Sequence, residues 1–233
     1  MINKAMILAA GFGKRIHPLT LIHPKPLLKI GKETLLSNAL KFLELFGVKE
    51  VVINVHYLAE QIVDYINGNQ FNLTITLVKE KDKILDTGGG VLNAIQHFSN
   101  LPFLIINPDT IWNSYYIKEL KLMEKSFFDN EKSKCSLLVV NKKKSFDQSL
   151  KGDFNLKNNS INREGTDDLN YIYTGLQIIK PKVFSDLDLK IFSMNKIWDK
   201  LIKTDELHGT ESNINFFHVS TLDIYKNLLK KKI

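Results

Sequence analysis

The hydrophobic positions in the first 110 residues follow two alternating patterns. Short apolar runs, typical of strands, are separated by stretches in which apolar residues recur every three or four positions, as on one face of a helix. Strands that alternate with helices form a mainly parallel sheet covered on both faces, and such sheets bind ligands at the carboxyl ends of their strands. The predicted strands are 4–10, 50–55, 73–78 and 103–106, and the predicted helices are 35–46, 59–66 and 90–98.

The pattern changes in the second half of the chain. Its apolar runs are short, and a polar, asparagine-rich hairpin is predicted near 152–165. No linker rich in proline, glycine or serine interrupts the chain, so we predict one α/β domain over 1–233, in which this half completes the sheet. The further predicted strands are 137–140, 172–179 and 216–219.

Composition narrows the class of protein. With 44% hydrophobic residues, a chain of 233 residues can bury a core large enough to fold without a disulfide or a structural zinc. The single Cys135 cannot form an intramolecular disulfide, and no cysteine and histidine ligand pattern is present. The apolar stretch 5–10 is too short for a signal peptide or a membrane span, so we expect a cytoplasmic protein with no membrane partner.

The net charge of +7 raises the question of a nucleic-acid partner. The 32 basic residues are mostly lysines scattered along the chain, so we expect a solvated basic surface and no nucleic-acid partner. A basic surface still favours the approach of small phosphorylated anions.

The stretch 8–26, LAAGFGKRIHPLTLIHPKP, carries the strongest chemical signal. Gly11 and Gly13 follow the first predicted strand, where a glycine turn lets exposed backbone N–H groups form an anion-binding nest. A guanidinium binds phosphate oxygens through two hydrogen bonds, so Arg15 suits a departing pyrophosphate. Lys25, held between two prolines, suits a fixed positive charge beside a reacting phosphate.

Two common nucleotide-binding motifs do not match this stretch. The P-loop spacing G-x-x-x-x-G-K-[ST] is missing, and Ile16 stands where the dinucleotide fingerprint G-x-G-x-x-G has its last glycine. We therefore set aside a P-loop kinase and a dehydrogenase.

The whole stretch resembles the G-x-G-x-R…P-x-T…P-K-P signature of the sugar-phosphate nucleotidyltransferases. The motifs NVHY at 54–57, LDTGGG at 85–90, NPD at 107–109 and YTG at 173–175 follow in the order that this family uses, so the resemblance extends over almost the whole chain. It is closest to the short bacterial N-acetylmuramate-1-phosphate uridylyltransferases, which are often named mannose-1-phosphate guanylyltransferases.

The resemblance implies a Rossmann-like, GT-A-like nucleotidyltransferase fold, with a nucleotide-binding half over 1–110 and a sugar-binding half over 111–233. In such a fold the backbone of the first glycine loop and a second turn at Gly88–Gly89 would hold the nucleoside. The nucleotide-binding residues so implied are Ala9, Ala10, Gly11, Phe12, Gly13, Lys14, Arg15, Lys25, Gly88 and Gly89, and the substrate-binding residues are His56, Asn107, Asp109, Gly152, Thr174 and Gly175.

Asp109 is the candidate metal ligand. It follows the apolar run FLII, at the predicted carboxyl end of a strand, and carboxylate oxygen is a ligand that Mg²⁺ prefers. An aspartate that only caps the loop is the alternative. Asn107, two residues earlier, is suited to donate a hydrogen bond to the sugar or the ribose.

His218 marks a departure from the family pattern. The family carries a second metal-binding aspartate in a late W-x-D-x-G-T string, and the matching segment here is FFHVST at 216–221. Imidazole is a poor ligand for Mg²⁺, so three interpretations stand open: His218 contacts a phosphate, Asp109 binds the metal with substrate oxygens and water, or Mn²⁺ replaces Mg²⁺. A loss of catalysis is the fourth.

The activity that the resemblance implies is the joining of a nucleoside triphosphate to a sugar 1-phosphate with release of pyrophosphate. Arg15, Lys25 and Asp109 would be the catalytic residues, and UTP with N-acetylmuramate 1-phosphate, in cell-wall recycling, the expected substrates. Mannose 1-phosphate with GTP and glucose 1-phosphate with UTP or dTTP are the alternatives, and a non-catalytic nucleotide-sugar sensor is the alternative of another class. We expect small-molecule partners and a monomer or small homo-oligomer.

Overall fold

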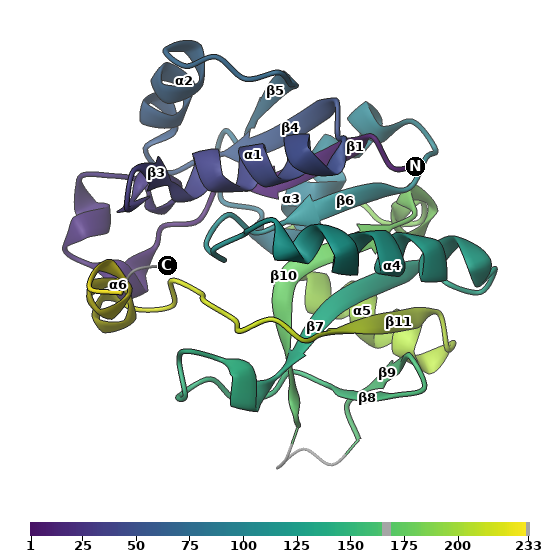
Figure 1. Cartoon of the computed structure of the whole chain (residues 1–233). Helices are drawn as coiled ribbons and strands as arrows, with labels where there is room; N and C mark the ends of the chain where they lie inside the picture. The colour runs from purple at the N-terminus through teal and green to yellow at the C-terminus, as the bar shows by residue number, and fades with distance from the viewer. Residues whose placement is uncertain (165–168, 232–233) are drawn as a thin grey trace.

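A sheet of nine strands runs through the part of the chain that the structure, a computed structural model, describes, residues 1–164 and 169–231 (Figure 1). The strand order is β5-β4-β1-β6-β10-β7-β11-β9-β8. The strands are β1 (Lys4–Leu8), β4 (Glu50–Val55), β5 (Thr74–Lys79), β6 (Phe103–Ile106), β7 (Cys135–Asn141), β8 (Asn155–Lys157), β9 (Ser160–Asn162), β10 (Tyr171–Ile179) and β11 (Leu207–Ser212), and a separate short hairpin joins β2 (Lys29–Ile30) to β3 (Glu33–Thr34).

The direction of the strands divides the sheet. Strands β5, β4, β1 and β6 are parallel to one another, whereas β10 is antiparallel to both of its neighbours, β6 and β7. β11 runs parallel to β7. The central parallel strands β1 and β6 are apolar and almost completely buried, as expected for strands covered by helices on both faces, whereas the edge strand β5 is partly exposed. The result is the single α/β domain that the sequence predicts.

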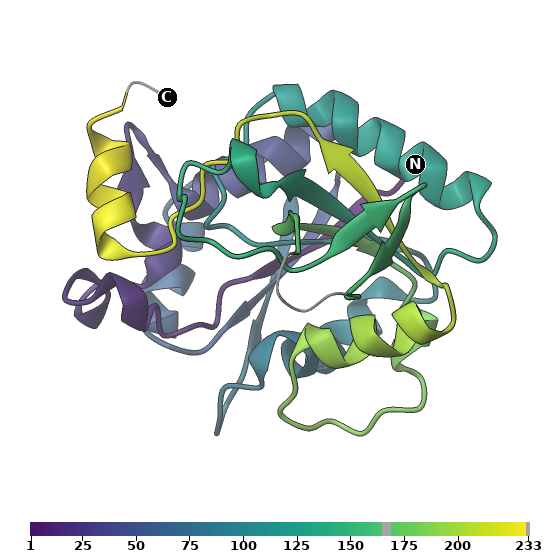
Figure 2. The ribbon, with the colours of Figure 1, turned by 90° about the horizontal axis from the view of Figure 1, so that it is seen from below.

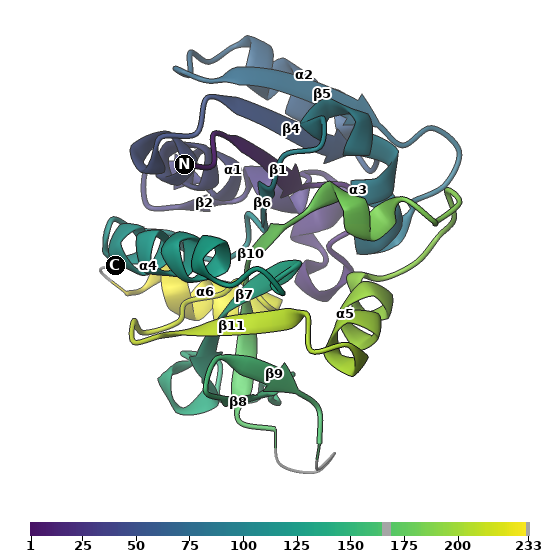
Figure 3. The same cartoon turned by 90° about the vertical axis from the view of Figure 1, so that its right-hand side faces the viewer.

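Helices cover both faces of the sheet, as Figure 3 shows with α1 and α4 on one face and α3 and α5 on the other. Two separate hydrophobic clusters lie between the helices and the sheet, one on each face. The helices are α1 (Leu35–Phe46), α2 (Ala59–Asn67), α3 (Asp86–Ala94), α4 (Tyr115–Asp129), α5 (Met194–Lys203) and α6 (Leu222–Leu229).

Helix α6 lies beside the segment that follows β1, as Figure 2 shows. Its Tyr225 and Leu228 are buried in a third hydrophobic cluster together with Ile16 and Leu35. The chain after β11 therefore returns to the end of the sheet where β1 finishes.

Several predicted elements are confirmed and others are wrong. The predicted helix 35–46 and the predicted strands 50–55 and 103–106 have the observed bounds, and a hairpin of β8 and β9 lies within 152–165, of which Gly165 lies outside the described residues. The predicted helix 90–98 begins earlier, at Asp86, and its last turn is a 3₁₀ helix, Ile95–Phe98.

The predicted strand 216–219 is not a strand. Phe216 and His218 instead form isolated bridges to Ser145 and Thr110, because two different loops lie on either side of this segment. The prediction also omits α4, α5, α6 and β11, in which polar and apolar residues are interspersed. No helix in the described ranges is both long enough and apolar enough to cross a membrane.

Candidate active site

A cavity of about 410 Å³ opens where β1, β4 and β6 end. Its walls are residues 8–11 and 13–16 from the end of β1 onward, Lys25 and Pro26, Asn54 in β4, Ile84, Asp86 and Thr87 around the start of α3, residues 107–109 after β6, and Ser220. Parallel strands point their carboxyl ends to the same edge, so loops that are far apart in sequence meet here.

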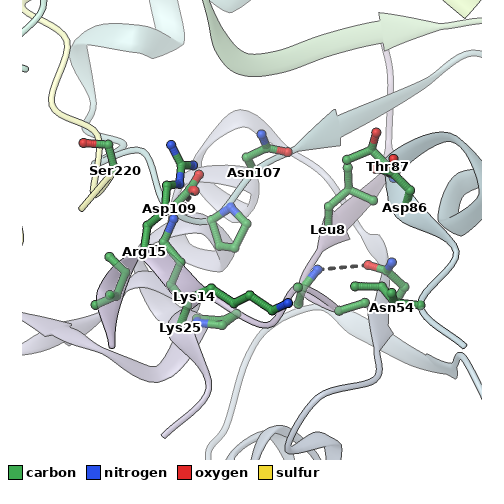
Figure 4. A pocket seen from close by; sticks show the side chains of 18 residues that line it. Leu8, Lys14, Arg15, Lys25, Asn54, Asp86, Thr87, Asn107, Asp109 and Ser220 are labelled. Atoms are coloured by element: carbon green, nitrogen blue, oxygen red, sulfur yellow. Dashed lines mark hydrogen bonds and ion pairs between the residues drawn. The ribbon is translucent and has the colours of Figure 1, made fainter. Parts of the chain in front are cut away.

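The cavity has two chemically different ends, seen in Figure 4. Arg15, Lys25 and Asp109 lie at one end, and Asn54 and Thr87 lie at the other. The first end carries two cations and suits phosphate, whereas the second offers the Asn54 amide, the Thr87 hydroxyl and the Asp86 carboxylate.

Most of the predicted nucleotide-binding loop lines the cavity. Gly13 adopts a left-handed conformation with φ of 65°, and a Cβ there would lie 2.9 Å from Thr20 Cγ2, so the turn requires glycine. Its carbonyl accepts hydrogen bonds from the Thr20 hydroxyl at 2.9 Å and the Ile16 N–H at 2.8 Å. Gly11 has open space where a Cβ would stand, which leaves its backbone accessible to a ligand.

Lys14 and Arg15 follow this turn and supply the positive charge that the sequence predicts for the cavity. Neither forms an ion pair with another residue in the described ranges. The Lys14 ammonium lies 5.4 Å from the centre of the Phe12 ring, which itself packs on Tyr57 rather than lining the cavity. These two cations are therefore available to an anionic ligand.

Asp109 is held by two basic side chains. Its Oδ2 accepts a hydrogen bond from Lys25 Nζ at 2.5 Å, and His218 Nε2 lies 3.1 Å from the same oxygen. Burial acts to raise the pKa of Asp109, but the charges of Lys25 and then His218, with their hydrogen bonds, outweigh it and hold that pKa far below its usual range. Asp109 is therefore a carboxylate at neutral pH.

The second oxygen of Asp109 is the feature that points to a metal. Oδ1 is buried and has no hydrogen-bond partner within the described part of the chain. A buried carboxylate oxygen without a partner is costly unless a ligand or an ion completes it. Asp109 thus fits a divalent cation through Oδ1, with substrate oxygens and water as the other ligands.

His218 lies beside the candidate metal ligand Asp109. Within the described ranges no group of three or more histidine, cysteine, aspartate or glutamate residues is arranged to hold an ion. The His218 ring stacks on Phe216 with centroids 5.6 Å apart, and its Nε2 faces Asp109. Its buried Nδ1 has no hydrogen-bond partner within those ranges either.

The loop that carries Asp109 is held by β10. The Asn107 N–H donates to the Gly175 carbonyl at 2.7 Å, and the Thr110 hydroxyl donates to the Thr174 carbonyl at 2.7 Å. Gly175 has φ of 93°, and a Cβ there would lie 2.9 Å from Asn107 Cβ. Thr174 and Gly175, predicted to bind substrate, thus hold the loop through hydrogen bonds and close packing, while Asn107 lines the cavity.

Gly88 and Gly89 form the first turn of α3 instead of a separate turn. Their N–H groups donate to the Phe192 carbonyl at 2.9 Å and 3.0 Å, and a Cβ on Gly89 would lie 2.3 Å from the Lys190 carbonyl oxygen. These glycines pack against the segment before α5, and the neighbouring Asp86 and Thr87 line the cavity.

The remaining predicted residues lie outside the cavity wall. His56 Nδ1 pairs with the Glu80 carbonyl at 2.7 Å, and Gly152 packs so tightly that a Cβ would lie 2.0 Å from the Leu169 carbonyl oxygen. The predicted site residues that line the cavity are Ala9, Ala10, Gly11, Gly13, Lys14, Arg15, Lys25, Asn107 and Asp109, and those that do not are Phe12, His56, Gly88, Gly89, Gly152, Thr174, Gly175 and His218.

Sequence reasoning missed Asn54 and Ser220 as lining residues. The available signal for Asn54 was a single amide inside the apolar run EVVINV, since a buried polar side chain there needs a partner. Ser220 stands where the late family string has glycine, and Asp86 and Thr87, also missed as lining residues, stand in the LDTGGG motif, so the family motifs were the available signal for these three.

Comparison with known proteins identifies the class. Residues 4–146 match the family model described as nucleotidyl transferase. The chain therefore belongs to the nucleotidyl transferase family, which confirms the resemblance to sugar-phosphate nucleotidyltransferases. Enzymes of this family generally use divalent metal ions, in agreement with the buried Asp109 Oδ1, which has no hydrogen-bond partner in the described ranges.

Two relatives carry the same name. The chain is 26% identical over 220 residues to the N-acetylmuramate alpha-1-phosphate uridylyltransferase of Caulobacter vibrioides, a match that covers 92% of this chain and 90% of the relative. It is 32% identical over 187 residues to the enzyme of that name from Neisseria meningitidis serogroup B, covering 79% of this chain and 78% of the relative.

A solved structure shows the same fold. The crystal structure of HddC from Yersinia pseudotuberculosis superposes with a TM-score of 0.76 at 24% identity and covers 98% of this chain and 99% of that one.

Proposed function

We propose that the chain condenses UTP with N-acetylmuramate 1-phosphate to give the UDP-sugar and pyrophosphate. The observation that carries the proposal is one cavity that joins an open glycine turn, the cations Lys14 and Arg15, and the paired Lys25 and Asp109. The turn and the cations suit a triphosphate, and the pair suits the site of phosphoryl chemistry.

The chemistry that this geometry supports is an in-line displacement. An oxygen of the sugar phosphate forms a bond to the α-phosphorus of the nucleotide while the bond from that phosphorus to the β-bridging oxygen breaks, and pyrophosphate leaves with the electron pair. The attacking phosphate is already an anion at neutral pH, so no catalytic base is needed. Positioning and charge neutralisation perform the catalysis.

Each residue then has one task in this proposal. The backbone around Gly11 approaches the nucleotide, Arg15 and Lys14 bind the departing pyrophosphate, and Lys25 lies beside the reacting phosphate. Asp109 Oδ1 would hold a divalent cation, Mg²⁺ or Mn²⁺, which when bound neutralises charge on the phosphate oxygens.

His218 has a supporting task in the same proposal. Its contact with Asp109 Oδ2 shares that oxygen with Lys25 and leaves Oδ1 for the cation. A cation bound there would have Asp109 as its protein carboxylate, and substrate oxygens and water would supply its other ligands.

The choice of sugar and base is supported by the shared name of the two relatives described above. Backbone groups that read the base discriminate weakly, so mannose 1-phosphate with GTP and glucose 1-phosphate with UTP or dTTP remain the competing pairs. A sensor that binds the product without catalysis is the competing function of another class.

The test is pyrophosphate release from UTP, GTP, CTP and dTTP against N-acetylmuramate, N-acetylglucosamine, mannose and glucose 1-phosphates, with Mg²⁺ or Mn²⁺. We expect one clear maximum at UTP with N-acetylmuramate 1-phosphate. The matched variants are Lys25→Ala, expected to lose activity, and Lys29→Ala, an exposed lysine outside the cavity expected to keep it. A maximum at another pair would overturn the substrate assignment, and tight binding of a UDP-sugar without turnover would establish the sensor.

A further inference from the structure

A buried carboxylate behind the cavity ties together two of its walls. Glu80 follows β5 and is only 2% exposed, and its neighbour Asn54, at the end of β4, is 3% exposed. Glu80 does not line the cavity, and nothing in the proposed reaction uses it. Charged side chains are seldom so deeply buried unless all of their oxygens are satisfied.

The hydrogen bonds around this pair form a chain that converges on Glu80 from both sides. The Ala9 N–H donates to Asn54 Oδ1 at 2.9 Å, an interaction drawn in Figure 4, and Asn54 Nδ2 donates to Glu80 Oε1 at 2.7 Å. The Leu85 N–H donates to Glu80 Oε2 at 2.7 Å. Each contact has one donor and one acceptor, and both carboxylate oxygens act as acceptors.

The backbone groups at either end of this hydrogen-bond network belong to the walls of the end of the cavity that holds Asn54 and Thr87. Ala9 begins the glycine loop after β1, and Leu85 directly precedes Asp86 and Thr87 at the start of α3. The backbone of Glu80 is itself held, since its N–H donates to the Val55 carbonyl at 2.9 Å. One carboxylate therefore fixes both walls relative to the end of β4.

We infer that Glu80 is a positioning residue for the nucleoside, acting through Asn54 and Leu85. This inference rests on the proposed function in one respect, namely that a nucleoside triphosphate occupies this cavity. Loss of the chain of hydrogen bonds would let the two walls separate, so nucleotide affinity would fall while the charged end with Lys25 and Asp109 stays intact.

Because both Glu80 oxygens accept hydrogen bonds, a substitution there creates a mismatch that a second substitution at position 54 can repair. In Glu80→Gln the side chain at position 80 has one acceptor oxygen for two donors, the Asn54 amide and the Leu85 N–H. Turning either amide moves the mismatch to another contact, so one pair of donors always faces each other. In Asn54→Asp a carboxylate oxygen faces Glu80 Oε1. The double variant restores the match, because the amide nitrogen introduced at position 80 donates to the carboxylate introduced at position 54. The amide oxygen at position 80 then accepts from the Leu85 N–H.

The experiment measures the Kd of UTP by calorimetry, together with KM and kcat, for the wild type, both single variants and the double variant. Each mismatch displaces the walls that contact the nucleotide, so we expect each single variant to raise the Kd and KM of UTP at least about fivefold, and the double variant to recover most of that affinity. kcat should change less than KM. Glu60→Gln, which removes an exposed glutamate of α2, is the charge-matched control.

Gly90→Ala disturbs the contact between Asn54 and Glu80 by crowding instead of by a change of charge. It changes no donor or acceptor of the chain, yet its Cβ would stand 2.7 Å from Asn54 Nδ2 and 2.8 Å from Glu80 Oε1. Alanine favours the helix, which offsets part of the crowding, so the variant remains measurable even if a single charge variant fails to fold. We expect it to weaken UTP binding as well.

The outcomes distinguish the inference from the proposed function. If the wild type binds none of the four nucleoside triphosphates, the proposed function fails. If the wild type binds UTP, but Gly90→Ala binds equally well or the double variant is no better than the single variants, the inference about Glu80 is overturned.

Discussion

At the scale of single residues, two basic side chains keep Asp109 ionised at the charged end of the cavity. Asp109 is a carboxylate because Lys25 and His218 flank one of its oxygens, and its other oxygen has no partner in the described part of the chain. Such an arrangement is costly for folding alone, since part of the buried carboxylate is unsatisfied. A ligand that completes the second oxygen would explain it, and substitutions at Asp109 and His218 test this explanation.

Asp109→Asn should reduce turnover by about 10² to 10³-fold, as the loss of one preorganised charged group usually does. The amide keeps the size of the side chain but removes the charge that binds a cation and pairs with Lys25. Pyrophosphate release under saturating substrates measures the effect. Asp129→Asn, on the exposed side of α4, is the matched control, and turnover within about threefold of wild type in Asp109→Asn would remove Asp109 from the mechanism.

His218→Asp should tighten the binding of Mn²⁺. A second carboxylate beside Asp109 would add a hard oxygen ligand where the histidine now stands. Titration of the ion, followed by electron paramagnetic resonance of free Mn²⁺, gives the dissociation constant without any need for turnover. His218→Asn, which also removes the ring but adds no charge, should not tighten binding, and equal affinities in both variants would show that no ion occupies this position.

At the scale of elements, the segment 190–194, which leads into α5, holds the start of α3 through hydrogen bonds and close packing. We call this contact the clasp. The Phe192 carbonyl accepts both glycine N–H groups of the first turn, and the Met194 N–H donates to the Thr87 hydroxyl at 2.9 Å. This contact explains the glycines at 88 and 89, since a Cβ on Gly88 would meet the Phe192 side chain and one on Gly89 the Lys190 carbonyl, whereas Gly90 faces Asn54 and Glu80. The positions of Asp86 and Thr87 in the cavity wall depend on it.

Gly89→Ala tests this clasp. Its Cβ would lie 2.3 Å from the Lys190 carbonyl oxygen, so the segment must move, and crowding of this kind costs about 1–3 kcal/mol of the free energy of unfolding. Urea denaturation measures the loss. Gly11→Ala, where a Cβ would meet nothing within 4 Å, should unfold at the same urea concentration as the wild type. Equal urea midpoints for the two alanine variants would mean that the segment moves away without a loss of stability, which would contradict the tight packing at Gly89.

At the scale of the whole molecule, loops from distant parts of the chain close the charged end of the cavity. Asp147 is 3% exposed and accepts hydrogen bonds from Ser149 and from Ser220, which lies 73 positions later in the chain. Burial acts to raise the pKa of Asp147, but the hydrogen bonds of Ser149 and Ser220, aided by the charge of His218, leave that pKa below its usual value.

This fixes the pH dependence of stability. Asp109 and Asp147 both have folded-state pKa values below those of the unfolded chain, about 3.9, so their contribution is complete above that pH and disappears as the pH falls through the folded-state values. We expect the free energy of unfolding in urea to fall below about pH 4 as these two carboxylates are protonated, and Asp153, whose pKa burial raises, to oppose part of that fall.

Ser220→Ala isolates the part of this dependence that Asp147 contributes. It should cost about 1.5–3 kcal/mol near neutral pH, since it removes a hydrogen bond to a charged group. The difference from the wild type should narrow in acid as Asp147 is protonated. A difference that is constant down to about pH 3 would contradict the assignment of Asp147 as an ionised anchor.

The sequence alone determined the features that depend on local order. Buried strands such as 103–106 and the amphipathic helix 35–46 were predictable because apolar periodicity reflects which faces are buried, and the glycine loop with Lys14, Arg15 and Lys25 was predictable because its residue types suit phosphate at short spacing. Asp109 was recognised for the same reason, as a polar residue at the end of an apolar strand. The elements that were missed, such as α4 and β11, mix polar with apolar residues and become stable only by packing on their neighbours.

Only the tertiary structure decided which predicted residues reach the cavity and which support it. Gly88, Thr174 and Gly175 match the family motif, but their hydrogen bonds and contacts are used by Phe192, Leu138 and Asn107. Glu80 carried no motif of its own, and its role became visible when the fold joined Ala9, Asn54 and Leu85 around it. The physical reason is that a hydrogen-bond donor or a close approach is satisfied by whatever the fold brings near, and sequence spacing carries no record of neighbours that lie dozens of residues away.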